Sequence, residues 1–446
     1  MKRPNLLMVT LHDLGCFLPC YGHPIHAPAT EALAAEGVVF QNHFSTGTVC
    51  SPSRGSIATG CYPHTHGLMG LVHRGWALDT ERCPHLASLL STQGYETWLF
   101  GFQHEHWDAS MLGYGAVDRC ATFHAEDVAQ RVAEWLASRG SAEKPFFASV
   151  GFSEVHRIGL QPSHFKRNVY RPARPEDTLV PPWLPDIPEI RQDLADFYGA
   201  IRHADAMTGV ILAALKKAGL EENTIVVFTT DHGASFMHGK ATLYDGGCKT
   251  ALLMRWPEGI PAGRKVAGLT SHVDILPTLF DLMGLPAPAH VQGVSAAGLI
   301  RGEAVEERDF VFAEKNYTNF FDPCRMARSQ RFKYIRKGLR TSIFDFQIPE
   351  IELSAWGWRR NDKMYGFYSS ERSQEELFDL DTDPGELRNL AESPSFSGEL
   401  ALLRKALDGH LEATDDPFRR LSIEILMPRD GYAGMDLSRG VRGRPA

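Results

Sequence analysis

NLLMVT, residues 5–10, is an almost uninterrupted run of apolar side chains near the start of the 446-residue chain. A strand with water on one face alternates apolar and polar residues, whereas a strand covered on both faces stays apolar along its length. The run therefore predicts a central strand of a parallel sheet. Two polar residues, His12 and Asp13, follow it closely.

Three more segments share this pattern: ETWLFG at 96–101, PFFASVGF at 145–152 and TIVVFTT at 224–230. Helical patterns separate these segments, and the longest covers 190–219. Strands that alternate with helices predict a doubly wound α/β sheet, in which helices cover both faces. We therefore expect one large α/β domain.

The pattern changes in the last part of the chain. The segment MARSQRFKYIR, 326–336, alternates like one strand with an exposed face, and a shorter strand is expected at 377–380. A helical pattern follows at 397–411. We expect a small antiparallel sheet with one covering helix, and we divide the chain into a catalytic α/β domain, 1–320, and a C-terminal α+β subdomain, 321–446.

An insert rich in Trp, Tyr and Phe, 339–374, interrupts this small sheet. Long inserts often carry function. Two readings stay open at this point: the insert lines a substrate pocket, or it packs against the body of the protein.

The composition narrows the class of protein. The chain carries 46 Lys and Arg against 54 Asp and Glu, a net charge of −8, which gives a nucleic-acid partner no support. Runs of about 18 apolar residues are absent, so we expect no membrane span, and without a secretory signal pattern we expect a cytoplasmic protein. Eight cysteines without a CxxC pair favour free thiols, with a zinc site at Cys16, Cys20, His23 and His26 as an alternative.

Several strands end in residues that bind metals or move protons. These residues are His12, Asp13, His104, His156, Asp231 and His232. In a doubly wound sheet the ligand lies outside the carboxyl ends of the strands, so the side chains are expected to converge. The sequence therefore predicts a metal or acid/base site at this edge.

The segment CSPSRGSIATG, 50–60, adds a nucleophile and a cation. A single cysteine is most often a small buried apolar residue. Here, however, Cys50 stands close to Pro52 and Arg54 at the start of a helical pattern. An arginine at a helix N-terminus forms an anion site, because backbone N–H groups and the helix dipole add to the guanidinium. This arrangement suits attack on a sulfate or phosphate ester.

The same segment resembles the signature of the formylglycine-dependent sulfatases of the alkaline phosphatase superfamily. The resemblance covers nearly the whole chain, including ELFDLDTDPGELRNLA at 376–391. Three stretches resemble the sulfamidase (N-sulfoglucosamine sulfohydrolase) branch: CSPSRGSIATGCYPHTHGLMGL at 50–71, LVPPWLPDIPEIRQDLADFY at 179–198 and EATDDPF at 412–418. The implied fold is alkaline phosphatase-like, a large mixed and mostly parallel sheet between layers of helices.

The resemblance also implies an activity, which is metal-dependent hydrolysis of O- or N-sulfates of a small molecule. A formylglycine-generating enzyme would oxidise Cys50 to formylglycine, the nucleophile. The metal site would consist of His12, Asp13, Cys50, Asp231 and His232. The catalytic groups would be Cys50, Arg54, His104, His156 and Lys240. Arg54 orients the formylglycine, His104 deprotonates its diol, and His156 and Lys240 contact the sulfate and leaving oxygens.

Three positions depart from the family pattern. His12 stands where the family has Asp, His232 where it has Asn, and Phe102 where it has a sulfate-binding Lys. Oxygen ligands suit Ca²⁺, the family's metal, whereas mixed imidazole and carboxylate ligands suit Mn²⁺ or Zn²⁺. Phosphonate monoester hydrolases resemble this chain at these positions.

Two alternatives to a sulfatase therefore stay open. One is a phosphonate monoester or phosphodiester hydrolase that uses the same nucleophile. The other is a relative that binds an anion without catalysis, which the intact Cys50, Pro52, Arg54, His104 and Lys240 argue against. The natural substrate and a homo-oligomeric state also stay open, and segments such as 64–74 are expected to set specificity.

Overall fold

The structure is a computed structural model, and it describes residues 3–118, 120–139, 144–157, 165, 169–318, 321–339 and 373–420. Nearly all of the aromatic insert 339–374 lies outside these residues, so its place beside a pocket stays a prediction.

The core is an eight-stranded sheet with the strand order β4-β3-β5-β1-β6-β7-β2-β8. At its centre, β1 (Asn5–Leu11) pairs in parallel with β5 (Phe146–Gly151) and β6 (Thr224–Thr230). The remaining strands are β2 (Val38–Phe44), β3 (Glu96–Gly101), β4 (Ala116–Asp118), β7 (Leu252–Arg255) and β8 (Arg264–Ser271). Because β7 runs antiparallel to β6 and β2 within an otherwise parallel sheet, the predicted mixed, mostly parallel sheet is confirmed.

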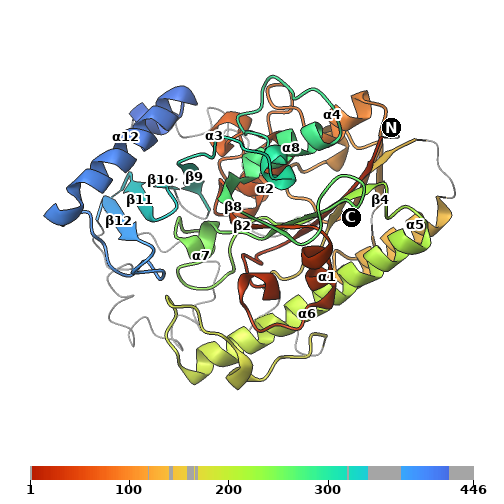
Figure 1. The fold of residues 1–446 in the computed structure, drawn as a ribbon, viewed down its shortest axis with the longest axis horizontal. Coiled ribbons are helices and arrows are strands. Elements are labelled where there is room, and N and C mark those ends of the chain that lie inside the picture. The colour runs from red at the N-terminus through yellow and green to blue at the C-terminus, as the bar shows by residue number, and fades with distance from the viewer. Residues whose placement is uncertain are drawn as a thin grey trace, which may run out of the picture.

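Helices cover both faces of this sheet (Figure 1). On one face lie α1 (Pro28–Glu36), α5 (Ala125–Ser138) and α6 (Pro188–Lys217). On the other lie α2 (Cys50–Thr59), α4 (Leu86–Thr92) and α8 (Ile275–Leu282). Each layer has its own apolar core, with Leu33, Val128 and Ile201 in the first and Ile57 and Leu279 in the second. Among the described helices, none has the length and apolarity to cross a membrane.

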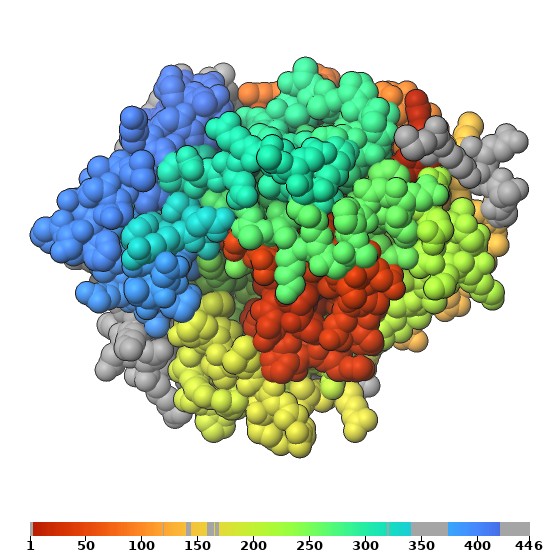
Figure 2. Space-filling view, viewed as in Figure 1, coloured from red at the N-terminus to blue at the C-terminus, as the bar shows by residue number. Residues whose placement is uncertain are grey.

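A second sheet of four antiparallel strands has the order β12-β11-β10-β9. It consists of β9 (Val311–Tyr317), β10 (Phe321–Arg328), β11 (Phe332–Lys337) and β12 (Glu375–Asp379), and α12 (Ser397–Ala413) packs against it. The small sheet with a covering helix is thus confirmed, and in Figure 2 this blue and cyan part forms one side of the molecule.

Two details of this second sheet differ from the expectation. The prediction of one strand over 326–336 is wrong, because the chain turns after β10 and returns as β11, with Met326 opposite Ile335. The turn lacks Gly, Pro or Asn, and Ser329, whose hydroxyl accepts from the Phe332 N–H, is only a weak turn signal. The sheet also begins at β9, before the division at residue 320, which itself stays a prediction.

Candidate active site

The carboxyl ends of β1 and β6 bring two aspartates together. The two strands pair in register to Leu11 and Thr230, so the residues that follow them, Asp13 and Asp231, emerge at the same edge. The backbone N–H of Asp13 donates to Asp231 Oδ1 at 3.0 Å. Asp13 has a φ of 54°. Residues other than glycine rarely adopt this left-handed backbone conformation, and those that do are concentrated at functional sites.

Helix α2 supplies the nucleophile position and an arginine. Cys50 is its first residue, at the start of the helical pattern. A proline in the first turn, Pro52, is compatible with this start. One turn on, Arg54 Nε donates to Asp231 Oδ2 at 3.2 Å, and the guanidinium also reaches Leu11 O at 3.4 Å.

Four side chains form a buried cluster with the spacing of a metal site. One ligand atom from each of His12, Asp13, Cys50 and Asp231 lies within 4.8 Å of all the others. His12 Nδ1 is 2.8 Å from Asp231 Oδ2, yet it makes no aligned hydrogen bond within the described residues. Two ligands that converge on one cation have this geometry, so the donor set fits a divalent metal ion.

His232 joins the cluster from its other side. Its Nδ1–H donates to Gly233 O at 2.9 Å, which leaves the Nε2 lone pair unprotonated in the neutral ring. This Nε2 lies 3.4 Å from Asp13 Oδ1 and 3.4 Å from Cys50 Sγ. A backbone carbonyl that fixes the tautomer of a histidine is the usual support of a metal ligand.

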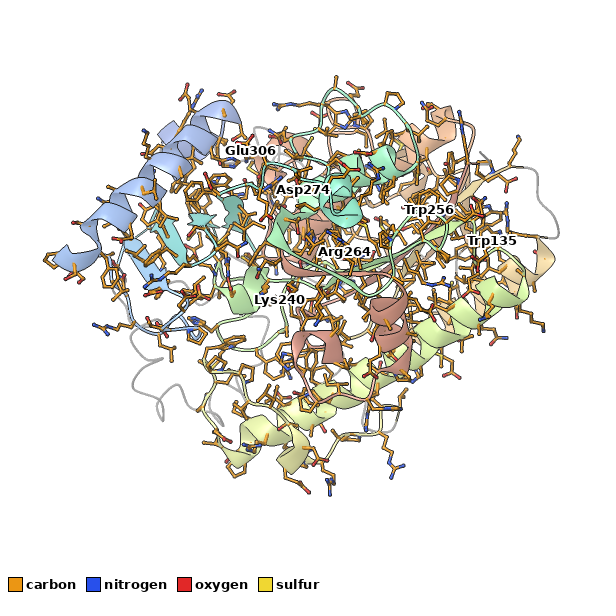
Figure 3. The ribbon with its side chains drawn as sticks, in the orientation of Figure 1. Trp135, Lys240, Trp256, Arg264, Asp274 and Glu306 are labelled. Carbon is orange, nitrogen blue, oxygen red and sulfur yellow. The ribbon has the colours of Figure 1, made fainter. Side chains whose placement is uncertain are left out.

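Lys240 and His156 form the cationic side of the site. Lys240 Nζ lies 2.9 Å from both oxygens of Asp13, 3.1 Å from His156 Nε2 and 3.8 Å from Cys50 Sγ. His156 Nδ1–H donates to Arg157 O at 2.8 Å, so its Nε2 is free to accept. In Figure 3 the label of Lys240 stands close to α7 (Asp245–Cys248), on the side of the large sheet that faces the small sheet.

His104 is not among the four residues with metal-ligand spacing. The Phe102 ring contacts both imidazoles beside it, with its centroid 4.3 Å from that of His12 and 5.5 Å from that of His104. Phe102 also lies 5.3 Å from Arg54 Cζ, so an apolar ring fills the position where the family has lysine. The hydrogen-bond partner of the His104 ring is His73, at 3.2 Å.

Sequence reasoning did not single out His73 or Arg157. His73 lies inside the segment 64–74 that was expected to set specificity, and nothing in its local pattern indicates a partner 31 positions later. Arg157 forms a buried ion pair with Asp193 of α6, which anchors the segment that carries His156. Such pairs depend on the tertiary fold.

The other candidate metal positions do not form a second site. The described residues place Cys16 and Cys20 in no group with metal-ligand spacing, so the zinc alternative has no support there. A second group does have that spacing: His64, Glu314 and Asp416. In this group Arg325 already holds Asp416 at 2.6 and 2.9 Å, so an ion-pair network accounts for it.

Electrostatics favour an anionic ligand and argue against a thiolate nucleophile. Burial lowers the pKa of His12 to about 3, so its ring is neutral and can bind a metal. Burial raises the pKa of Cys50 despite the nearby Lys240, so the thiol stays protonated. Two carboxylates, Asp13 and Asp231, balance the cations Lys240 and Arg54, so a divalent ion makes the site positive.

Comparison with known proteins agrees with this geometry. The family model described as Sulfatase matches residues 4–285. The chain belongs to the sulfatase family. It is therefore a sulfuric ester hydrolase, and the family implies a metal ion and a formylglycine. A second model, described as N-sulphoglucosamine sulphohydrolase, C-terminal, matches residues 233–347 of this sulfatase.

Individual relatives of this sulfatase cover most of its length. An ulvan-active sulfatase from Formosa agariphila is 29% identical, over 93% of this chain and 76% of the relative. The human N-sulphoglucosamine sulphohydrolase is 27% identical, over 93% of this chain and 91% of the relative. Among solved structures, a 2-O GAG sulfatase has a TM-score of 0.73 at 24% identity, covering 94% of both chains. The phosphonate monoester hydrolase of Agrobacterium radiobacter has a TM-score of 0.67 at 22% identity, covering 92% of this chain and 96% of the hydrolase. At these identities the two structures show the shared fold alone.

Proposed function

We propose that this sulfatase removes sulfate from a sulfated sugar with a formylglycine made from Cys50. The observation that carries the proposal is the position of Cys50. Its Sγ lies 3.4 Å from His232 Nε2 and 3.8 Å from Lys240 Nζ, within a cluster of metal-ligand spacing. A formylglycine-generating enzyme would supply the modification. When present, the hydrated aldehyde supplies an oxygen nucleophile that the buried, protonated thiol cannot provide.

The cationic side chains bind and orient the sulfate. Arg54 is fixed by Asp231 and Leu11 O, so its position requires no rearrangement during the reaction. Lys240 Nζ reaches both Asp13 and His156, and it stabilises negative charge on the sulfate and leaving oxygens. His156 Nε2 lies 3.1 Å from Lys240 Nζ, so the two side chains can contact the same sulfate and leaving oxygens.

Asp13, Asp231, His12 and His232 would hold one divalent metal ion. When bound, the ion polarises the sulfate and stabilises negative charge. With two carboxylates and up to two neutral imidazoles, the donor set suits Mn²⁺ or Zn²⁺ better than Ca²⁺, which prefers oxygen ligands.

The proposed substrate is a sugar that carries an N- or O-sulfate. Supporting relatives are the human N-sulphoglucosamine sulphohydrolase and the ulvan-active sulfatase. A solved sulfatase of the same fold is described in complex with D-glucosamine-2-N,6-O-disulfate, with a TM-score of 0.69 at 18% identity. A small anionic sugar would match the positive charge that a divalent ion gives the site.

The test is a substrate panel with protein co-produced with a formylglycine-generating enzyme. The panel contains glucosamine N-sulfate, glucosamine O-sulfates, nitrophenyl sulfate and nitrophenyl phenylphosphonate, each assayed for kcat/KM. We expect the highest value for a sulfated sugar, and we expect Cys50→Ala to abolish turnover. Undetectable release of sulfate from all sulfated compounds by modified, metal-loaded protein would contradict the proposal.

A second candidate is hydrolysis of phosphonate monoesters or phosphodiesters. The observation that favours it is that His12 and His232 both face the cluster, while Phe102 fills the lysine position. Faster turnover of nitrophenyl phenylphosphonate than of every sulfate in the same panel would establish this second function as the main one.

A further inference from the structure

His73 and His104 form a directly bonded imidazole pair at the edge of the site. His73 lies in the short helix η2 (Val72–Arg74), and His104 lies in the segment that follows β3. His73 Nδ1 is 3.2 Å from His104 Nε2, and the two rings are nearly parallel, with 8° between their planes. Two ring nitrogens in this contact share one proton, so one ring donates and the other accepts.

The pair connects the interior with the solvent. The other nitrogen of His104, Nδ1, is buried and has no hydrogen-bond partner within the described part of the chain. His73, in contrast, is exposed. A buried nitrogen without a partner thus belongs to a ring that is one hydrogen bond away from a ring that can exchange protons with water.

Hydrogen bonds from backbone N–H groups to two side chains fix the turn that carries His104. The His104 N–H donates to the buried Glu105 carboxylate at 2.7 Å. The Gln103 side-chain oxygen accepts from the N–H groups of Glu105 at 2.8 Å and of His106 at 3.1 Å. These three bonds hold the turn that carries His104.

The surrounding charges disfavour a proton that stays on His104. The groups that act on its ring are His12, His73, Arg54 and Lys240, and burial adds to their effect. Arg74 and Lys240 act on His73. Since burial and the cations Arg54 and Lys240 all lower the pKa of the His104 ring, a positive charge on it is costly. A proton that arrives there must be passed on.

We propose that His73 is the relay partner of His104 and carries protons between the buried ring and solvent. The proposal rests on the proposed function, and it takes His104 as the base that removes a proton from the reacting hydroxyl, the role that the family resemblance implies. His104 Nδ1 accepts that proton, the Nε2–H proton of His104 moves to His73 Nδ1, and His73 releases its Nε2 proton to water. One proton enters at His104 Nδ1 and one leaves from His73 Nε2. His73 is therefore a positioning residue that acts through His104.

The first test needs no turnover. ¹⁵N NMR of histidine-labelled protein with the unmodified Cys50 thiol reports which ring nitrogen carries the proton, with His73→Asn and His104→Asn used for assignment. We expect His104 as a neutral ring protonated at Nε2, and we expect His73→Ala to change the His104 nitrogen shifts. A proton at Nδ1 of His104, or shifts that His73→Ala leaves unchanged, would overturn the relay.

The second test is kinetic and uses the modified enzyme. We expect His73→Ala to lower kcat by about 10²-fold with KM nearly unchanged, and added imidazole to restore part of the loss. His106→Ala is the control, because His106 lies in the same segment but its ring bonds to Asp108. A higher KM at unchanged kcat, without imidazole rescue, would make His73 a substrate contact and overturn the relay. Absence of sulfatase activity in the unmutated enzyme would instead count against the proposed function, while the NMR result would still decide the pair.

Discussion

Lys240 Nζ lies 2.9 Å from each carboxylate oxygen of Asp13, so a buried lysine and a buried aspartate form a bidentate ion pair beside Cys50. Burial alone would raise the pKa of Asp13, but Lys240, together with His156 and His232, lowers it below its usual value. Asp13 is therefore charged at neutral pH even before an ion binds, as a metal ligand would need to be. The same lysine can then contact a sulfate oxygen when a metal shares the charge of Asp13.

Replacing Lys240 by Met tests this pair. The change leaves the Asp13 charge buried without its lysine, and breaking a buried ion pair costs about 3–5 kcal/mol of the free energy of unfolding. We expect this loss in metal-free protein and a partial recovery when Mn²⁺ or Zn²⁺ is added, measured by urea unfolding. The activity of the modified enzyme should fall by about 10²-fold or more.

Lys216→Met is the matched control, since Lys216 is 75% exposed and lies 3.7 Å from Glu221. We expect this substitution to change the free energy of unfolding by no more than about 0.5 kcal/mol. Equal stabilities of Lys240→Met and the unmutated protein without metal would contradict the account of Asp13.

His12→Asp tests the metal site. The change replaces an imidazole by a carboxylate beside Asp13 and Asp231, which produces a set richer in oxygen. We expect the ratio of Ca²⁺ to Mn²⁺ affinity to rise, measured by competition titration with elemental analysis. The exposed His26→Asp serves as control and should leave the ratio unchanged. An unchanged ratio in His12→Asp would remove His12 from the ligand set.

Gly233→Ala tests the support of His232. A Cβ at Gly233 would lie 1.9 Å from Gly246 O, which is backbone and cannot rotate away. The segment that accepts the His232 Nδ1–H would have to move. We expect a loss of at least about 1–3 kcal/mol in the free energy of unfolding and weaker metal binding.

The control for this prediction is Gly409→Ala in α12, where a Cβ would meet no atom within 4 Å. Alanine in a helix should stabilise the protein there by up to about 1 kcal/mol. If Gly233→Ala gave a similar gain, the close backbone contact could not be what positions His232.

Asp416→Asn tests the buried network between α12 and the small sheet. Burial alone would raise the pKa of Asp416, but Arg325 outweighs it and lowers the pKa to about 2. Because the folded pKa is depressed, the ionised carboxylate stabilises the protein above the unfolded pKa of about 3.9, and this contribution is lost as pH falls toward 2. We expect the stability difference between the unmutated protein and Asp416→Asn to shrink by about 2 kcal/mol over that range, measured by urea midpoints.

An equal difference at about pH 5 and about pH 2 would contradict the depressed pKa. Arg131→Gln is a suitable comparison, because its ion pair with Asp118 lies on the surface, with Arg131 50% exposed. Surface pairs contribute about 0–1 kcal/mol, so its pH dependence should be weak.

Much of the fold could be predicted from local patterns. The ranges expected for the strands 96–101 and 224–230 match β3 and β6 residue for residue, since aromatic and β-branched side chains mark these strands. Strand β8 was not expected, because RKVAGLTS mixes charged and small residues and has no clear period. The turn between β10 and β11 was not expected because Ser329 is its one turn-favouring residue, and serine alone is a weak signal.

The candidate site also has a part that local patterns could predict and a part that they could not. Residues at strand ends, such as His12 and Asp231, could be predicted to converge because parallel strands share one edge. The contacts Lys240–Asp13 and His73–His104 could not, since they join residues 227 and 31 positions apart through loops whose course no local pattern fixes. The cytoplasmic location, the division at residue 320 and the homo-oligomer stay predictions.

The most direct test of the central claim is peptide mass spectrometry of Cys50 in active protein. The account predicts that the peptide carries an aldehyde in place of the thiol, and that sulfatase activity rises in proportion to the fraction of modified peptide. Full activity in protein whose Cys50 is entirely an unmodified thiol would contradict it.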